Sequence, residues 1–222
     1  MPTSNRIILT DVDGVLLEWE HHFTKWMLQR HYYDEKGNAI YPYTLLPDKE
    51  NTYEMAERFG LTKFQIRKEI REFNKSAWMA TQEPMPDCVK WVKLLHAEGW
   101  TFIPITSQTS DLPAQALRKR RLAEVFGEDV FSNYHILETG ADKDDALEQF
   151  KDTGLIWVED KPYNVLTGLK FGLQCILIDH AYNKDFSHPE VTRVNNWKQI
   201  HQIAHENLRR LGLERRYSIP SM

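Results

Sequence analysis

The sequence predicts an α/β protein: a doubly wound, Rossmann-like parallel sheet with a mostly helical cap inserted after the first strand. Short, continuous apolar runs suit strands that are buried on both faces, and helical patterns alternate with these runs. Residues 19–84 break the alternation and are rich in aromatic and charged side chains. We therefore expect a core of residues 1–18 and 85–222, and a cap of residues 19–84.

Four apolar runs are the predicted strands: 7–9, 100–105, 155–158 and 175–178. The first run leads into Asp11–Gly14, a turn that contains glycine. The second run contains Pro104, which has no amide to donate to a neighbouring strand. We expect this strand either to pair poorly at Pro104 or to end its sheet hydrogen bonds early.

Two helices are expected within the insertion. Thr52 precedes a short helical pattern that Gly60 closes. Thr62 and Gln65 have the spacing of a capping box, and apolar residues follow them at helical spacing. The preceding segment, Asp34–Asn51, is expected to be irregular.

Helices are also expected between the later strands. Asp87 is a candidate N-cap for a helix that ends before Gly99. Further helical patterns cover residues 114–123 and the segment after Pro162. Strands that alternate with helices in this way form a parallel sheet with right-handed crossovers.

The composition excludes several classes of function. The 28 basic and 32 acidic side chains give a net charge of −4, so there is no electrostatic reason to expect DNA or an anionic membrane as a partner. No run approaches about 18 apolar residues, and acidic residues come too early for a signal peptide, so we expect a cytoplasmic protein. Cys88 and Cys175 lie far apart in apolar segments and are expected to be buried, free thiols.

Asp11 and Asp13 are the first candidates for chemistry. Residues two apart on an extended chain point the same way, so both carboxylates are expected at one place. Neighbouring carboxylates repel each other unless one is protonated or a cation lies between them. Such a pair suits a nucleophile that works with a metal and a general acid/base. A turn with two solvated acids is the alternative.

Polar side chains also follow the next elements. Thr106 and Ser107 come after the second strand, where a hydroxyl can donate to a phosphoryl oxygen or simply cap a turn. Lys143 lies at a helix start, with Asp142 as the candidate cap. The helix dipole disfavours a lysine there, so Lys143 is either solvated or close to an anion.

Glu159 and Asp160 directly follow the third apolar run, and Pro162 begins the next helix. Paired acids at the end of a buried strand suit a hard cation such as Mg²⁺. A capped helix without any ligand is the alternative. Four groups therefore follow one another along the chain, each at or near the end of a predicted element: the acids at 11 and 13, the hydroxyl at 106, the lysine at 143 and the acids at 159 and 160.

This order resembles that of the haloacid dehalogenase-like hydrolases, a superfamily that includes phosphatases with an aspartate nucleophile. The resemblance rests on four short motifs and covers residues 5–18 and 85–200. It implies that Asp11 forms an aspartyl-phosphate and that Asp13 is the acid/base. It also implies that Thr106, with Ser107 beside it, and Lys143 bind the phosphate.

The resemblance also implies a Mg²⁺ ion held by the Asp11 and Asp160 side chains and by the backbone carbonyl of Asp13. The fourth motif usually reads Gly-Asp or Asp-Asp, so Glu159 departs from the pattern. Glu159 and Asn164, four residues after Asp160, are expected to support the metal ligand. The implied activity is a magnesium-dependent phosphomonoesterase acting on a small phosphorylated metabolite.

A nucleoside monophosphate is the first candidate substrate. Glu18–Glu20 and Ile178–Asn183 look similar to segments of the 5′(3′)-deoxyribonucleotidase branch of the superfamily. Near the start of the cap, Trp19, Phe23 and Trp26 are candidates to stack on a nucleobase. The alternative is that these aromatic rings form the core of the cap.

Two other functions stay open. One is a phosphatase that acts on the 3′ or 5′ ends of nucleic acids, and the other is a phospho-aspartate switch without rapid turnover. The basic run Arg118–Arg121 and the arginine pairs at 209–210 and 215–216 are the candidate nucleic-acid contacts. The negative net charge favours solvated helix faces instead, so nucleic acid is not an expected partner.

Overall fold

A six-stranded, wholly parallel sheet forms the centre of the computed structural model, which describes residues 6–50 and 52–210. The arginines at 215–216 therefore lie outside the described residues. The strands, in spatial order, are β5 (His135–Leu137), β4 (Thr101–Ser107), β1 (Ile7–Thr10), β6 (Ile156–Glu159), β7 (Gln174–Ile178) and β8 (Thr192–Val194). The doubly wound α/β fold is confirmed; β5 and β8 were not predicted.

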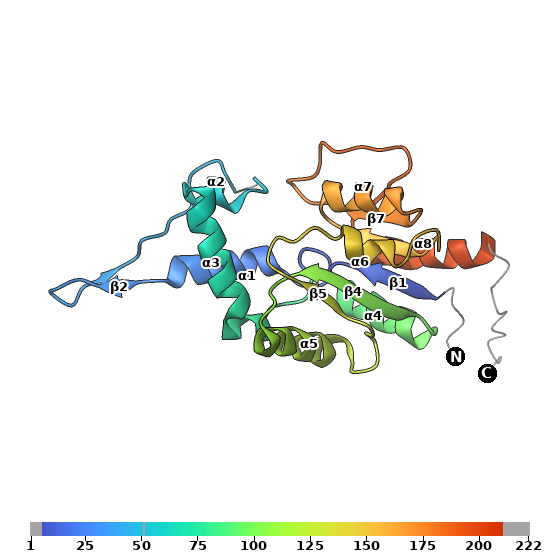
Figure 1. The fold of residues 1–222 in the computed structure, drawn as a ribbon, viewed down its shortest axis with the longest axis horizontal. Helices are drawn as coiled ribbons and strands as arrows, with labels where there is room; N and C mark the ends of the chain where they lie inside the picture. Colours follow the sequence, from blue (N-terminus) through green and yellow to red (C-terminus); the bar gives the residue numbers. More distant parts are fainter. Residues whose placement is uncertain (1–5, 51, 211–222) are drawn as a thin grey trace.

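Helices cover both faces of the sheet. One face packs against α4 (Cys88–Ala97), α5 (Leu112–Phe126) and α8 (Trp197–Arg210). The other packs against α6 (Asp144–Glu148) and α7 (Pro162–Lys170), and Figure 1 shows these two helices across the sheet from α4 and α5. Successive strand residues alternate between the faces, so continuous apolar runs bury side chains on both.

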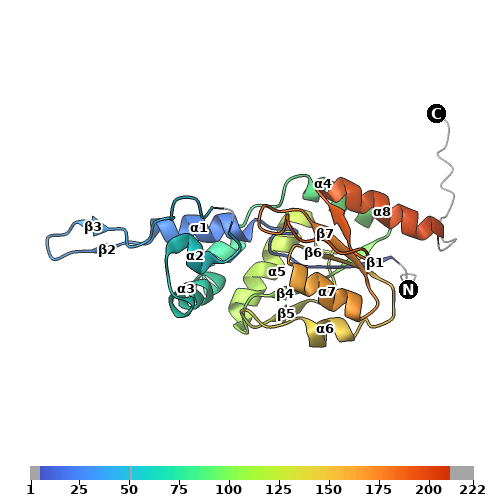
Figure 2. The ribbon, with the colours of Figure 1, turned by 90° about the horizontal axis from the view of Figure 1, so that it is seen from above.

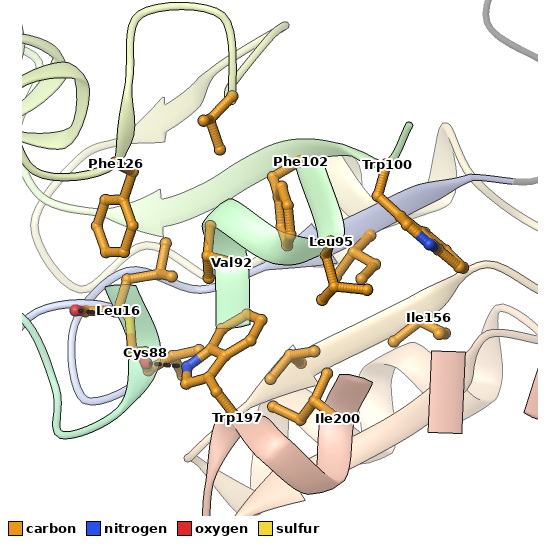
Figure 3. Packing of buried hydrophobic residues seen from close by; sticks show 14 of the residues in the cluster. Leu16, Cys88, Val92, Leu95, Trp100, Phe102, Phe126, Ile156, Trp197 and Ile200 are labelled. Atoms are coloured by element: carbon orange, nitrogen blue, oxygen red, sulfur yellow. Dashed lines mark hydrogen bonds between the residues drawn. The ribbon is translucent and has the colours of Figure 1, made fainter. Parts of the chain in front are cut away.

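The larger core lies between the sheet and α4, α5 and α8 (Figure 3). Trp197, at the start of α8, packs against Phe102 of β4, and its indole N–H donates to the carbonyl of Val15 at 2.9 Å. This hydrogen bond fixes the backbone that follows Asp11–Gly14 to α8, 182 positions later in the sequence. Cys88 and Cys175 are buried and unpaired, as predicted.

Two predicted helix caps act differently. Asp87 precedes α4, but its backbone is left-handed (φ 59°), whereas a capping residue is normally extended. Its carboxylate instead accepts hydrogen bonds from the backbone amides of Trp197 and Lys198 and so caps α8. Asp142 does not cap α6, because Lys143 occupies the N-cap position.

Pro104 lies within β4 and does not end it. The amides of Phe102 and Gln108 both donate towards the β5 side, so the absent amide of Pro104 would face the same side. At that point the neighbouring chain has left the bridge between Phe102 and Phe131 and has not yet begun pairing at His135. The proline therefore removes no hydrogen bond that the sheet would otherwise make.

The predicted cap, residues 19–84, forms a hydrophobic cluster of its own. Its elements are α1 (Trp19–Gln29), β2 (Tyr32–Tyr33), β3 (Ala39–Ile40), α2 (Met55–Phe59), α3 (Lys63–Lys75) and the 3₁₀ helix η1 (Ala77–Ala80). The capping box of Thr62 and Gln65 is present, and Gly60 closes α2. Figures 1 and 2 show the cap elements on one side of the core.

Part of the segment predicted to be irregular is an antiparallel hairpin. Tyr32 pairs with Ile40 and Tyr33 with Ala39. The Asp34 carboxylate accepts the backbone amides of Lys36 and Asn38, which stabilises the turn locally. No helix in the described ranges 6–50 and 52–210 has the length and apolar character needed to span a bilayer.

Gly168 of α7 provides a test of the packing between this helix and the sheet. A Cβ at this position would lie 2.5 Å from Trp157 Cδ1 and 2.7 Å from Cys175 Sγ. Alanine normally stabilises a helix interior by about 1 kcal/mol relative to glycine. We expect Gly168→Ala to destabilise the protein by about 1–3 kcal/mol, because overpacking outweighs helix propensity. Thermal unfolding measures this, and the exposed Lys170→Ala is the control; a stabilised Gly168→Ala variant would contradict the packing.

Candidate active site

The carboxyl ends of β1, β4 and β6 converge on one pocket. These three strands are neighbours at the centre of the parallel sheet, so their ends lie at the same edge. The pocket has a cavity volume of about 510 Å³, and Asp11, Asp13, Thr106, Lys143 and Asp160 all line it. The cap contributes residues of α1, α2 and α3 to the other walls. The structure thus brings together residues up to 149 positions apart in the sequence.

Lys143 links two of the acidic groups. Its ammonium lies 2.7 Å from Asp11 Oδ2 and 3.0 Å from Glu159 Oε1, and all three side chains are buried. Burial alone would lower the pKa of Lys143, but Asp11 and Glu159 outweigh it and raise the pKa. Lys143 is therefore charged. The carboxylates of Asp11 and Glu159 are the nearby anions that stabilise a lysine at this helix start.

Glu159 holds the surrounding backbone in place. One carboxylate oxygen accepts the backbone amides of Asp160 and Lys161, at 2.7 and 3.3 Å. The other accepts Lys143 and the side-chain amide of Asn164. Both oxygens are therefore occupied by donors, so Glu159 positions Lys143 and Asp160 and has no free oxygen for a ligand.

The loop after β7 supports Asp160, although none of its residues was predicted as part of the site. The Tyr182 hydroxyl donates to Asp160 Oδ2, and the Asn183 side-chain amide donates to the Asp160 carbonyl at 2.7 Å. The His180 ring lies 2.7 Å from the carbonyl of Gly14 and stacks on Tyr182. The only sequence signal for these contacts was the segment Ile178–Asn183.

Gly14 is required at its position for two reasons. Its φ of +75° lies in the left-handed region, where other residues are strained. A Cβ there would also overlap the Asp160 carboxylate. The absence of a side chain at Gly14 therefore lets Asp160 approach Asp11.

The acidic cluster is electrostatically costly even with the Lys143 ammonium in place. Burial, then the nearby Glu159, raises the pKa of Asp11 to about 6. Burial, together with the charge of Asp11, raises the pKa of Asp160 to about 6 as well. Carboxylate oxygens of Asp11, Glu159 and Asp160 lie within 4.8 Å of one another. Both Glu159 oxygens already accept hydrogen bonds, so Asp11 and Asp160 are the two carboxylates that could hold a hard divalent cation, which prefers oxygen ligands.

Asp13 makes an ion pair that was not predicted from the sequence. Its Oδ1 lies 2.6 Å from Arg118 Nη1, and the Arg118 side chain is completely buried. The expectation of a solvated helix face for Arg118–Arg121 is therefore wrong for Arg118. Burial raises the pKa of Asp13 more than Arg118 lowers it, so Asp13 holds a proton more readily than an ordinary aspartate.

The two hydroxyls after β4 differ in their availability. Thr106 Oγ1 is buried and has no hydrogen-bond partner among the described residues, so it is free to donate to a ligand in the pocket. The Ser107 hydroxyl donates to the carbonyl of Ala141 at 2.8 Å. Ser107 thus fixes the loop before Lys143, although it also lines the pocket.

The three aromatic residues proposed to stack on a base occupy different places. Trp19 lines the pocket, and its indole N–H donates to Asn74 Oδ1 at 2.9 Å. Phe23 is fully buried in the cap cluster, and Trp26 packs against that cluster with Arg30 over its ring. Phe23 and Trp26 do not line the pocket, because the cap needs their rings for its own core.

A reciprocal pair of hydrogen bonds joins the cap to the core beside the pocket. The Asn74 side-chain amide donates to the carbonyl of Gln108 at 2.9 Å, and that of Gln108 donates to the carbonyl of Asn74 at 3.1 Å. Both side chains are buried. This contact fixes the end of α3 relative to the end of β4.

Comparisons with known proteins gave matches among solved structures alone. No family model matches the chain, and no curated protein matches it in sequence. A haloacid dehalogenase-like family hydrolase from Streptococcus pneumoniae is 15% identical with a TM-score of 0.59, over 90% of this chain and 98% of that one. CbbY from Rhodobacter sphaeroides, solved in complex with phosphate, is 18% identical with a TM-score of 0.56, over 88% and 96%.

A third similar structure is YfnB from Bacillus subtilis, described as a HAD-hydrolase bound to magnesium. It is 10% identical to this chain with a TM-score of 0.55, and the match covers 90% of this chain and 98% of that one. At identities this low, structural matches of this extent establish the fold alone. The chain therefore has the fold of the haloacid dehalogenase-like hydrolases, as its four motifs predicted.

Proposed function

We propose that this protein is a magnesium-dependent phosphomonoesterase in which Asp11 is the nucleophile. The observation that carries the proposal is the buried cluster of Asp11, Lys143 and Asp160 at the end of the central strands, beside the Thr106 hydroxyl, for which the described part of the chain offers no hydrogen-bond partner. The cluster combines a nucleophilic carboxylate with donors for phosphoryl oxygens. The fold, and similar structures that contain phosphate or magnesium, support the same activity.

The chain's own residues account for both halves of the reaction. A carboxylate oxygen of Asp11 forms a bond to phosphorus as the ester P–O bond breaks, and Asp13 gives its proton to the leaving oxygen. Water then attacks the aspartyl-phosphate, Asp13 takes a proton from that water, and the bond between Asp11 and phosphorus breaks. Lys143 and Thr106 hold the other phosphoryl oxygens throughout. Asp11 and Asp160 would hold the Mg²⁺ ion, which when bound would neutralise charge on the phosphoryl group.

Arg118 holds Asp13 in position for this role. The 2.6 Å ion pair fixes the carboxylate at the edge of the pocket, while burial keeps its pKa above the ordinary value. A residue that must first donate and then accept a proton works best when its pKa is close to the operating pH. The pair also favours rapid turnover over a long-lived phospho-aspartate switch, because it supplies a positioned acid/base.

The pocket also indicates the substrate class. Lys63, Arg67 and Arg71 lie at i, i+4 and i+8 on α3, so they form one row on a single helix face about 12 Å long. All three line the pocket, and among the described residues none lies within ion-pair distance of a carboxylate. We therefore propose a small organic phosphate that carries a second anionic group, bound by this row.

A nucleoside monophosphate is the second candidate, and it is supported by two aromatic residues, Trp19 and Tyr53, among those that line the pocket. The similarity to deoxyribonucleotidases stays a prediction. A cavity of about 510 Å³ suits a small molecule better than a nucleic-acid end. Turnover of nucleotides, sugar phosphates, bisphosphates and phosphorylated oligonucleotides, compared at two salt concentrations, separates these classes.

The first prediction concerns the two aspartates of the turn. With Mg²⁺ and a generic aryl phosphate, Asp11→Asn should lower kcat by about 10⁴-fold or more, because the covalent step is lost. Asp13→Asn should lower kcat by about 10²–10⁴-fold, the usual contribution of a general acid/base. Asp34→Asn, on the exposed hairpin, is the control. Undiminished phosphate release by a folded Asp11→Asn variant would exclude Asp11 as the nucleophile.

The second prediction concerns the metal. Mg²⁺ at about 100 times its Kd should raise the Tm of the wild type by about 5–10 °C. Asp160→Asn should abolish this shift, yet the metal-free variant should be no less stable than the wild type, since a buried charge is removed.

A folded-state pKa of about 6 lies above the ordinary value of 3.8, so Asp160 contributes stability at low pH that is lost as pH rises through 6. The metal-free wild type should therefore lose more Tm between pH 5 and 7 than Asp160→Asn; an equal loss would show that Asp160 is not the strained group.

The third prediction concerns the basic row. Arg67→Ala or Arg71→Ala should raise KM about five- to tenfold for a substrate with two anionic groups, equivalent to about 1–1.4 kcal/mol. The KM for a singly anionic aryl phosphate should change little. Lys68→Ala is a matched control, because Lys68 lies on the same helix and does not line the pocket. Equal effects on both substrates would refute the second-anion site while leaving the phosphatase proposal intact.

A further inference from the structure

A cluster of two histidines and one glutamate lies away from the pocket, between α4 and α8. His201 and His205 are one turn apart on α8, so their rings share one helix face. Both Nε2 atoms point to Glu98, the C-cap residue of α4, at 3.1 Å and 2.8 Å from Glu98 Oε2. None of the three residues lines the pocket. Figure 2 shows α4 and α8 side by side on one side of the core.

We propose that Glu98, His201 and His205 form a second metal site, for Zn²⁺ or a similar divalent ion that prefers imidazole ligands. One ligand atom from each residue can be chosen so that all three lie within 4.8 Å of one another. Ligands about 2.0–2.1 Å from a tetrahedral zinc ion lie about 3.3 Å apart, so the two N–O separations are already close to those of a coordinated set. Two imidazoles, one carboxylate and a water would complete the coordination.

The surroundings leave these ligand atoms available. Arg6 donates to the backbone carbonyl of Glu98, so this arginine does not occupy the carboxylate. All three side chains are partly exposed, at 17–29%, so an ion can reach them from solvent. Glu98 lies at the C-terminal end of α4, where the helix dipole favours a cation. Each imidazole binds through its Nε2 lone pair, with its remaining proton on Nδ1.

The packing makes this position rigid enough to preorganise a site. Ile200, Ala204 and Leu208 of α8 pack into the same core cluster as Val92 and Leu95 of α4, so the two helices cannot shift freely. The Trp91 ring lies 5.0 Å from the His201 ring and limits its rotation. A bound ion would therefore join the last described helix to α4 with little rearrangement.

The donor chemistry separates this site from the acidic cluster in the pocket. Imidazole ligands suit zinc, whereas the all-oxygen cluster of Asp11 and Asp160 suits magnesium. The inference does not depend on the phosphatase proposal, because it uses none of the pocket residues. An Asp11→Asn variant without phosphatase activity should bind zinc at this site as the wild type does.

The experiment titrates Zn²⁺ into the tag-free, full-length protein by calorimetry, with excess Mg²⁺ present to occupy the acidic cluster. We expect one equivalent to bind, and His201→Ala or His205→Ala to weaken it by at least about 10–100-fold, the loss seen when even outer partners of a metal ligand are removed. His31→Ala, on the exposed hairpin, is the matched control. The proposal would be overturned if the wild type did not bind zinc, or if both His201→Ala and His205→Ala bound zinc as tightly as the wild type.

A second measurement separates metal binding from a purely structural hydrogen-bond network. His205→Gln keeps a hydrogen-bond donor for Glu98 but has no imidazole. We expect its Tm in chelator to match that of the wild type, and the zinc-dependent rise in Tm to be lost in this variant. Co²⁺ in place of Zn²⁺ should give a visible absorption band in the wild type and none in His205→Gln. A zinc-dependent Tm rise that persists in His205→Gln would contradict the site.

Discussion

The structure depends on the burial of several charges at the end of the central strands. Asp11, Glu159 and Asp160 are carboxylates that burial destabilises, and Lys143 is the buried ammonium that bonds two of them. One ammonium among three acids leaves the cluster negative and attractive to a second cation. Such a cluster is tolerated only where donors surround it, and the backbone amides and the Tyr182 hydroxyl supply them. The parallel sheet makes this possible, because it delivers the ends of three strands to one place.

Much of the fold could be predicted because its signals are local. The four apolar runs, the capping box of Thr62 and the closing Gly60 act within a few residues, and each is present in the structure. The two additional core strands, β5 and β8, have only three residues each, which is too short for a periodic pattern to mark. Asp87 shows the limit of predicting helix caps from the sequence. An aspartate before a helix predicts a cap for that helix, but the backbone of Asp87 is left-handed and its carboxylate caps α8, 110 positions away.

The candidate site, like the fold, could be predicted from the sequence only in part. Motif order predicted that Asp11, Thr106, Lys143 and Asp160 would converge, and all four line one pocket, because strand ends meet at a fixed edge of the sheet. Their partners could not be predicted, since a pairing such as Asp13 with Arg118 depends on how α5 packs, and the basic run around Arg118 looks like a solvated face. Phe23 and Trp26 show the converse: sequence alone cannot decide whether an aromatic ring near a site faces the ligand or the core.

The departure of Glu159 from the usual motif follows from the same electrostatics. A glycine at this position could not bond Lys143, and Lys143 would then have Asp11 as its one carboxylate partner among the groups described here. With Glu159 present, the ammonium is shared between two carboxylates, so it compensates the negative charge of Asp11 less completely. The same carboxylate fixes the amides of Asp160 and Lys161 and the side chain of Asn164. Glu159 thus couples the position of Lys143 to that of Asp160, and both of these residues line the pocket.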